Sequence, residues 1–394
     1  MSRHTETVVP PPRKIILDCL GVRIGEQRGA ERFICSLIAE LAAAKNEDFL
    51  LLINTSCVEF VQTLLPRSQY VVLPISGKSR ALRMLVQMIV GPILATRHRA
   101  PLYVSTHLFP TFGFGCPTAG FLHDLMLYHF PSEFRPGVWR VRDKLLKLSI
   151  PSLSAIFTVS RFCAEDIAQK FPKQADSIFI VHNGSHPSLV PLPPQHRVQE
   201  VLEHLGLLDK KFVLSVLGGG KYKNPGVLVD ASKALLESGR GDVQLVAVGD
   251  CIRVLREMSC PENLHVLGFV SDEVLTVLYS HASALVFPSL FEGFGIPIIE
   301  AQAISLPVIC SDIPVFREVG GEGSVYVDPR SPKSIANAVI TVVDSSELQQ
   351  RLIHKGLENA RRYTWRHSME MFLSACEFVI GRKERKKLLR TTSV

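Results

Sequence analysis

The chain has 394 residues, of which 46% are hydrophobic and 21% charged, and its formal net charge is +7. This composition is typical of a globular protein and excludes a disordered or fibrous chain, and the length suits two domains. No run reaches the roughly 18 apolar residues of a membrane-spanning helix, and no signal peptide is visible.

The first half of the chain predicts strands that alternate with helices. Residues 1–13 are polar and end in prolines, which indicates a loose tail. The segment 14–20 (KIILDCL) predicts a strand, 21–29 (GVRIGEQRG) a glycine loop, and 30–44 a helix with apolar residues at helical spacing. Further strands are predicted at FLLLIN, VVLPI, PLYVS, TAGFLHD and SAIFTVS. The alternation favours a parallel sheet with helices on both faces.

The second half repeats this pattern after a proline-rich linker at 190–197. Residues 211–219 predict a strand, and 223–239 predict a helix with proline near its start. Further strands are predicted at VQLVAVG, LHVLGFV and ALVFPS, and a further helix at SDEVLTVLYSHA. We therefore predict two doubly wound α/β domains with a cleft between them, where ligands lie beside the carboxyl ends of the strands.

The stretch FPSLFEGFGIPIIEAQA (287–303) places two carboxylates after a predicted strand. Gly293 and Gly295 predict a turn that carries Glu292, and Glu300 falls about one turn into the following helix. The helix dipole alone favours a glutamate in a first turn, so Glu300 has two open interpretations, a helix-dipole residue or a ligand contact. Glu292 is not needed for capping, and the amides beside it would suit a phosphate or a sugar hydroxyl.

This stretch resembles the Glu-x7-Glu motif of retaining glycosyltransferases of family 4, which have the GT-B fold. Other segments resemble the same family, namely GFLHDLMLYHFPSEF (120–134), AIFTVSRFCAEDIAQKF (155–171), IFIVHNGS (178–185) and PVICSDIPVFREVGGEGSVYVDP (307–329). The resemblance covers roughly residues 14–370. It implies an acceptor-side Rossmann-like domain and a nucleotide-sugar-binding one, joined a second time by a last helix that crosses back. The expected limits are a flexible tail at 1–13, an N-terminal domain at 14–187, a C-terminal domain at 188–365, the crossing helix at 366–382 and a basic tail at 383–394.

The resemblance also implies roles for the glutamates and their neighbours. Glu292 matches the glutamate that contacts the donor sugar, and Glu300 matches the one that binds the ribose hydroxyls of the nucleotide. The turn between them, with Gly293, Phe294 and Gly295, would bring backbone amides to the middle of the nucleotide sugar.

The loop GGGKYKNPG (218–226) is the expected site for the donor's diphosphate. The family usually has an arginine and a lysine here; Lys223 matches the lysine, and Lys221 is the nearest cation to the missing arginine. A lysine offers a point charge where an arginine would offer a bidentate fork, and two solvated lysines before a helix remain the alternative. The glycine loop with Gly25 resembles the family's first-strand loop, which approaches the donor phosphate and the acceptor.

The resemblance predicts sugar transfer with retention by a front-face substitution, in which the leaving diphosphate helps to deprotonate the acceptor. His123 would lie beside the donor sugar, and His123, Glu292 and Lys223 are the predicted catalytic residues. No Asp-x-Asp motif is present, so we expect no metal and no cofactor. The His-Asp segment resembles those of mannosyl- and rhamnosyl-transferring members, which favours GDP-mannose as donor, with a UDP-sugar as the alternative.

Two other functions remain open at this point, a sugar-nucleotide epimerase and a catalytically silent scaffold with the same fold. The expected acceptor is a saccharide or a lipid-linked saccharide, which points to polysaccharide or lipopolysaccharide assembly. Basic residues flank the apolar stretch 84–95 and fill 381–390. They predict either solvated surfaces or peripheral contact of 80–99 with the inner face of the cytoplasmic membrane, and nucleic acid is disfavoured. Nine cysteines without a Cys-x-x-Cys pair predict a reduced cytoplasmic protein.

Overall fold

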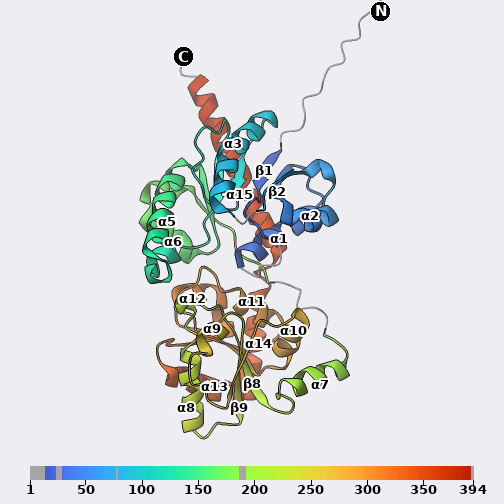
Figure 1. The fold of residues 1–394 in the computed structure, drawn as a ribbon, viewed down its shortest axis with the longest axis vertical. Coiled ribbons are helices and arrows are strands. Elements are labelled where there is room, and N and C mark those ends of the chain that lie inside the picture. Colours follow the sequence, from blue (N-terminus) through green and yellow to red (C-terminus); the bar gives the residue numbers. More distant parts are fainter. Residues whose placement is uncertain (1–13, 24–28, 77–78, 186–191, 392–394) are drawn as a thin grey trace, which may run out of the picture.

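The chain forms two parallel β-sheets, each covered by helices, which lie one above the other in Figure 1. The computed structural model describes residues 14–23, 29–76, 79–185 and 192–391. Both sheets are doubly wound, which confirms the predicted α/β class with two Rossmann-like units.

The first sheet, within the described residues, has seven strands in the order β3-β2-β1-β4-β5-β6-β7, with every neighbouring pair parallel. Its strands are β1 (Ile15–Asp18), β2 (Phe49–Asn54), β3 (Tyr70–Leu73), β4 (Tyr103–Ser105), β5 (Thr118–Phe121), β6 (Ala155–Thr158) and β7 (Ile178–Ile180). Its helices are α1 (Gly29–Ala43), α2 (Val58–Leu64), α3 (Arg80–Arg97), α4 (Met126–His129), α5 (Pro136–Ser149) and α6 (Arg161–Lys170). The strand order reverses between β1 and β4, so the carboxyl ends of these strands flank a crevice.

The second sheet has six strands in the described chain, in the order β10-β9-β8-β11-β12-β13, and they too are all parallel. Its strands are β8 (Lys211–Val216), β9 (Val243–Val248), β10 (Leu264–Gly268), β11 (Ala284–Phe287), β12 (Val308–Ser311) and β13 (Ser324–Val327). Its helices are α7 (Gln195–His204), α8 (Val227–Glu237), α9 (Ile252–Leu255), α10 (Asp272–His281), α11 (Ile296–Ala303), α12 (Pro314–Gly320), α13 (Pro332–Asp344) and α14 (Ser346–Ala360). Here the order reverses between β8 and β11.

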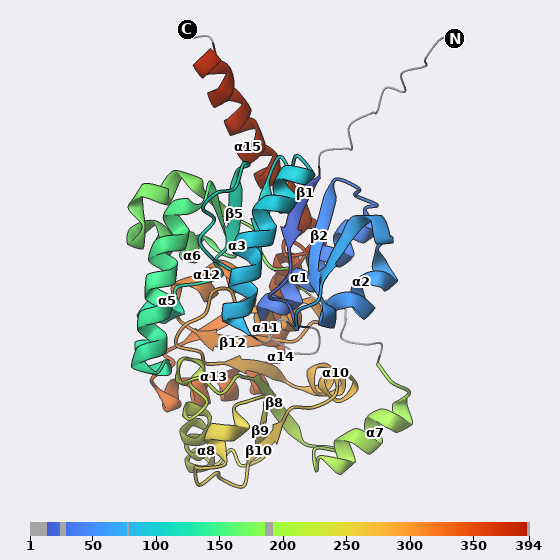
Figure 2. The ribbon, with the colours of Figure 1, turned by 45° about the horizontal axis from the view of Figure 1, so that its top comes forward.

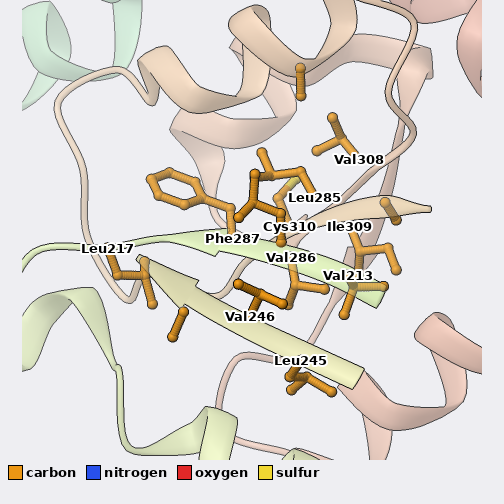
Figure 3. Packing of buried hydrophobic residues seen from close by; sticks show 14 of the residues in the cluster. Val213, Leu217, Leu245, Val246, Leu285, Val286, Phe287, Val308, Ile309 and Cys310 are labelled. Carbon is orange, nitrogen blue, oxygen red and sulfur yellow. The ribbon is translucent and has the colours of Figure 1, made fainter. Parts of the chain in front are cut away.

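The core of the second sheet explains why its strands read as continuous apolar runs. All four residues of β11 and all four of β12 are buried, because helices cover both faces of a parallel sheet. Figure 3 shows Val213, Leu245, Leu285, Val308 and their neighbours packed around the strands in one cluster. This rigid core holds the loops that follow β8 and β11.

The last helix, α15 (Trp365–Thr391), returns to the first sheet and runs through the upper unit in Figures 1 and 2. Its Trp365, Phe372 and Cys376 belong to the same buried cluster as the apolar face of α1. The helix ends later than predicted, at Thr391 rather than 382, because the basic run that follows is rich in lysine, arginine and leucine, which are good helix formers.

The two chain crossings between the units lie side by side. Ser185 pairs with Thr364 in a short parallel bridge, and the Ser185 amide donates to the carbonyl of Tyr363 at 2.8 Å. A side chain at Gly184 would collide with the backbone of Trp365, so this close approach requires glycine. The predicted linker at 190–197 begins in residues that the structure does not describe.

Helix α3 is continuous through Pro92. Of the helices in the described part of the chain, none combines the length and the hydropathy that a membrane span requires.

Candidate active site

A cavity of about 330 Å³ lies between the two units, at the carboxyl ends of the strands. Its walls come from the first unit through Arg32, His123 and Asn183, and from the second through Lys223 and the turn that begins at Glu292. Lys223 follows β8 and Glu292 follows β11, so these two residues flank the point where the order of the second sheet reverses. This is the place where doubly wound sheets bind ligands.

Lys223 and Glu292 form an ion pair on the cavity wall, with Lys223 Nζ 2.6 Å from Glu292 Oε1. Ser289 Oγ donates to the same carboxylate oxygen at 3.0 Å, and Nζ also lies 5.1 Å from the centre of the Tyr222 ring. Burial lowers the pKa of Lys223, but Glu292 raises it, and the net shift is upward. The ammonium therefore stays charged at neutral pH, and its three donors can serve Glu292 and an incoming anion together.

The turn that carries Glu292 requires glycine at two places. Gly293 lies against the first unit, where an added side chain would come within 2.9 Å of the His123 carbonyl oxygen. Gly295 has a φ of +102° as the N-cap of α11, and a side chain there would press on Phe316. The Gly293 carbonyl accepts a hydrogen bond from Ser160 Oγ at 2.7 Å. The turn is thus fixed from both units.

Glu300 lies in α11 and is only 8% exposed. It does not line the cavity itself, but Arg32, which does, approaches Glu300 Oε1 with its Nη1 at 3.3 Å. Tyr279 OH donates to the other oxygen of Glu300 at 3.5 Å. Burial raises the pKa of Glu300, and Arg32 and Tyr279 partly counteract this rise. Arg32 and Tyr279 both contact the buried carboxylate of Glu300. The helix dipole alone therefore does not account for a glutamate at this position.

His123 and Asn183 bring polar atoms without partners to the cavity wall. His123 Nε2 and Asn183 Oδ1 are buried and accept or donate no hydrogen bond within the described protein. The His123 ring is held between Phe33 and Phe121, and burial lowers the pKa of His123 to about 4. The imidazole is therefore neutral at pH 7. A buried polar atom without a partner is costly, so both atoms indicate a ligand with hydrogen-bonding groups.

The remaining predicted site residues are placed differently. Lys221 is exposed and does not line the cavity, because residues two apart in a helical turn point to different sides. Its backbone amide donates to Glu133 at 3.2 Å, which is a contact between the two units. Phe294 lines the cavity and packs against His182 and Tyr363. Gly25 lies outside the described residues.

Sequence reasoning missed Arg32 as a site residue and Glu318 as a structural one. Glu318 in α12 accepts the backbone amides of Arg161 and Phe162, at 2.7 and 3.0 Å, and so caps helix α6 of the other unit. Both contacts join residues more than 150 positions apart, so no local pattern could reveal them. Asn183 could have been found, because it lies in the Asn-Gly segment that carried part of the resemblance.

The described residues contain no group of three or more histidine, cysteine, aspartate or glutamate side chains arranged to hold a metal ion. The charged side chains that line the cavity are instead Lys223, Arg32 and the two acidic residues Glu292 and Asp124, and the neutral imidazole of His123 lines it as well. Such an arrangement can hold an anionic leaving group and orient the hydroxyl groups of a sugar.

Two family models match the chain. The model described as Glycosyltransferase Family 4 matches residues 27–189, and the one described as Glycosyl transferases group 1 matches residues 199–359. Together they follow the division into two units, and the second includes Lys223, Glu292 and Glu300.

Similar proteins of known sequence include two mannosyltransferases. The O-antigen chain mannosyltransferase B of Escherichia coli is 27% identical over 64% of this chain and 68% of its own length. The O-antigen chain mannosyltransferase RfbU of Salmonella typhimurium is 31% identical over 55% of this chain and 58% of its own length. The aligned part thus spans just over half to two thirds of these relatives.

Solved structures share the fold at low sequence identity. A glycosyltransferase from Rickettsia africae superposes with a TM-score of 0.70 at 15% identity, over 93% of this chain and 99% of that one. WaaG, a glycosyltransferase involved in lipopolysaccharide biosynthesis, gives 0.68 at 16% identity over 93% and 99% of the two chains. Anabaena HepE, in complex with UDP and glucose, gives 0.69 at 18% identity over the same shares. These likenesses confirm the GT-B fold.

Proposed function

Because the chain belongs to the family 4 glycosyltransferases, we propose that it transfers a hexose from a nucleotide-diphosphate sugar to a saccharide or lipid-linked saccharide, with retention of configuration. Mannose from GDP-mannose is the first choice, since the two curated relatives above are mannosyltransferases. A UDP-sugar is the alternative, since HepE was solved with UDP and glucose.

One observation carries the proposal: the cavity wall combines a charged lysine, paired to Glu292, with buried atoms of His123 and Asn183 that have no partner. A nucleotide sugar has both chemistries that this wall needs. Its diphosphate would bind Lys223 and the amides of the turn, and its sugar hydroxyls would bind Glu292 and His123. Glu300, with Arg32 beside it, is our choice for the ribose hydroxyls.

In the proposed reaction the protein mainly stabilises the charge that develops on the leaving diphosphate. Lys223 is suited to this because it is protonated and held by Glu292 before the donor arrives, so little reorganisation is needed. Because His123 is neutral, it would not serve as a second cation for the diphosphate. Its Nε2 would instead form a hydrogen bond with a sugar hydroxyl. The leaving diphosphate would take the proton of the acceptor hydroxyl on the same face of the sugar, and we propose that no metal takes part.

The names of the same relatives support a proposal for the product class, and helix α3 supports one for the location. We propose that the enzyme acts in the assembly of a surface polysaccharide or of lipopolysaccharide, at the inner face of the cytoplasmic membrane. Residues 80–99 support peripheral contact, because Arg97 and Arg99 are exposed beside the exposed side chains of Ile89 and Ile93.

The proposal is tested by calorimetric titration of the protein with UDP, GDP, ADP and dTDP in the presence of EDTA. Binding of one nucleotide would identify the base of the donor and support a metal-independent site. That nucleotide's sugars are then supplied with candidate acceptors, and the anomeric configuration of the product is determined by NMR. The absence of binding by all four would refute the donor assignment and favour a silent scaffold.

A further inference from the structure

A second cavity, which we call the side pocket, adjoins the candidate donor site within the first unit. Its volume is about 240 Å³, and its walls come from the first turn of α3, from α5 and from the segment that follows β5. Asp124 lines both cavities, so a molecule in the side pocket lies next to the donor cavity. In a glycosyltransferase this neighbouring space is where an acceptor has to lie for its hydroxyl to reach the donor sugar.

The side pocket is lined by two guanidinium groups from opposite helices, Arg83 of α3 and Arg142 of α5. Arg83 is only 6% exposed, and its charge counteracts the rise that burial causes in the pKa of Asp18. The Arg142 guanidinium lies over the ring of Phe134, 4.6 Å from its centre, which holds it beside another lining residue of the pocket. Planar guanidinium groups held in this way suit phosphate and carboxylate oxygens, which they bind in bidentate fashion.

The side pocket has two further charged or titratable lining side chains, Asp124 and His107. Asp124 is the one carboxylate among the described lining residues, and its Oδ1 accepts the Met126 amide at 2.8 Å. His107 completes the polar part of the wall, beside Gly21, where any larger residue would collide with its ring. All other lining side chains are apolar. The pocket thus combines an apolar interior with two cations.

Apolar side chains continue from the side pocket over the surface of α3 and α5. On α3, Leu82, Leu85, Ile89 and Ile93 follow one another at helical spacing and are 48–60% exposed. On α5, Val138, Val141 and Leu148 form a second exposed row, and Leu145 between them lines the pocket. Figure 2 shows both helices on the side of the upper unit that faces the viewer. Exposed apolar rows of this length indicate a surface that another molecule covers.

We propose that the side pocket selects an acceptor that is an anionic amphiphile, in which a phosphate ester or diphosphate joins the saccharide to a hydrocarbon chain. Arg83 and Arg142 bind the phosphate, and the hydrocarbon chain lies along the apolar rows of α3 and α5. The saccharide then extends past Asp124 towards the donor cavity. This inference rests on the proposed function, because it takes the donor cavity as the place of reaction.

The test is calorimetric titration with octyl phosphate below its critical micelle concentration, beside octyl glucoside and inorganic phosphate as probes. We expect octyl phosphate to bind the wild-type protein at least tenfold more tightly than either of the other two. Arg142→Gln should weaken its binding at least tenfold, whereas Arg140→Gln, an exposed arginine on the same helix, should not change it. Arg83→Gln should weaken the binding of octyl phosphate as well. Because Arg83 is buried, this variant could fail to fold, and the test then depends on Arg142→Gln.

A variant of the donor site separates this inference from the proposed function. Lys223→Ala should bind octyl phosphate as the wild type does while losing affinity for nucleoside diphosphates, and Arg142→Gln should show the reverse. Loss of octyl phosphate binding in Lys223→Ala would overturn the inference, because the probe would then occupy the donor cavity. Equal binding of octyl glucoside would overturn the role of the arginines, and equal binding of inorganic phosphate would overturn the role of the apolar rows. A wild-type dimer in solution that binds no octyl phosphate would assign the apolar rows to a second copy of the chain.

Discussion

The two units share one plan, a doubly wound parallel sheet, but they differ in what they leave exposed. The first unit, with the returning helix α15, exposes large apolar side chains at eleven described positions: Leu64, Leu82, Leu85, Met88, Ile89, Ile93, Phe112, Val138, Val141, Leu148 and Phe378. The second exposes four: Leu192, Leu208, Met258 and Phe269. The second unit instead places paired charges, Lys223 with Glu292, at the cavity. The difference indicates a division of labour, in which one unit binds a compact charged donor and the other meets an extended, partly apolar acceptor.

The largest effect is expected from Lys223→Ala, which removes the positively charged partner of Glu292 from the donor cavity of the second unit. Removing one preorganised group that stabilises developing charge typically costs about 10²–10³ in turnover. We expect a loss of that size in kcat for sugar transfer, measured with saturating donor. Lys221→Ala is the matched control, because Lys221 is exposed and does not line the cavity. An equal loss in both variants would mean that the loop as a whole, and not the Lys223 ammonium, stabilises the leaving group.

Glu292→Ala should lower turnover about 100-fold, at the lower end of the range for a preorganised electrostatic group. It should leave the affinity for the bare nucleoside diphosphate nearly unchanged, because Glu292 is assigned to the sugar. Calorimetry of the nucleotide and rate measurements on the same preparation check the two halves of this prediction. If the variant stopped binding the nucleotide, the division of roles between the two glutamates would be wrong.

Glu300→Ala should show the opposite pattern, with weaker nucleotide binding as its primary defect. A hydrogen bond to a charged group contributes about 1.5–3 kcal/mol, so the dissociation constant should rise by roughly one to two orders of magnitude. The matching titration with the free base in place of the nucleotide should show no change, since the base lacks the ribose hydroxyls. An unchanged dissociation constant for the nucleotide would contradict the assignment of Glu300.

Charge reversal at Arg97 and Arg99 tests whether the exposed basic residues of the first unit bind a membrane. Each basic residue near an anionic membrane contributes about 1 kcal/mol to binding, so the double Glu variant should bind phosphatidylglycerol vesicles clearly more weakly. Lys233→Glu with Arg256→Glu, both exposed on the second unit, makes the same change in net charge and should have little effect. Arg83 is not suited to this experiment: it is buried at the side pocket, contrary to our expectation of a surface position. Sedimentation of the protein with vesicles measures both variants.

The smallest effect is expected from Glu318→Ala, which removes the cap that one unit supplies to helix α6 of the other. Loss of a cap costs about 1 kcal/mol, measured as a fall in the free energy of unfolding in urea. Glu322→Ala, an exposed neighbour, is the control. Burial raises the pKa of Glu318. His182 and the amides of α6 lower this pKa by more than burial raises it, so the net shift is downward. The stabilisation by Glu318 is therefore present above its ordinary pKa of 4.5 and is lost as the pH falls through the lower folded value.

The sequence predicted the parts of this protein that depend on local pattern. The segment FLLLIN became β2 with the predicted limits, because a buried parallel strand is a continuous apolar run. Lys223 and Glu292 could be placed near one cavity, because both follow strands and the carboxyl ends of parallel strands share one edge.

Other features depend on how the units meet, and no local pattern encodes this. The pairing of Arg32 with Glu300 and the cap by Glu318 each join the two units across a long stretch of sequence. The sequence pattern also could not predict that Lys221 is exposed, because this depends on the direction in which its side chain leaves a short helical turn. The side pocket is formed by α3, α5 and the segment after β5, which are separate in the sequence, so it could not be predicted before these segments were placed in space.

The return of α15 to the first sheet also determines the order in which a newly synthesised chain can complete its two cores. The second sheet has all of its described strands once Val327 has been made, whereas the first core still lacks Trp365 and Phe372. A core without one such aromatic side chain loses about 3–5 kcal/mol. The half that is made first thus becomes stable last. While the ribosome completes the chain, the part of α1 that packs against α15, including Phe33, stays uncovered, and this is the surface that a chaperone would shield.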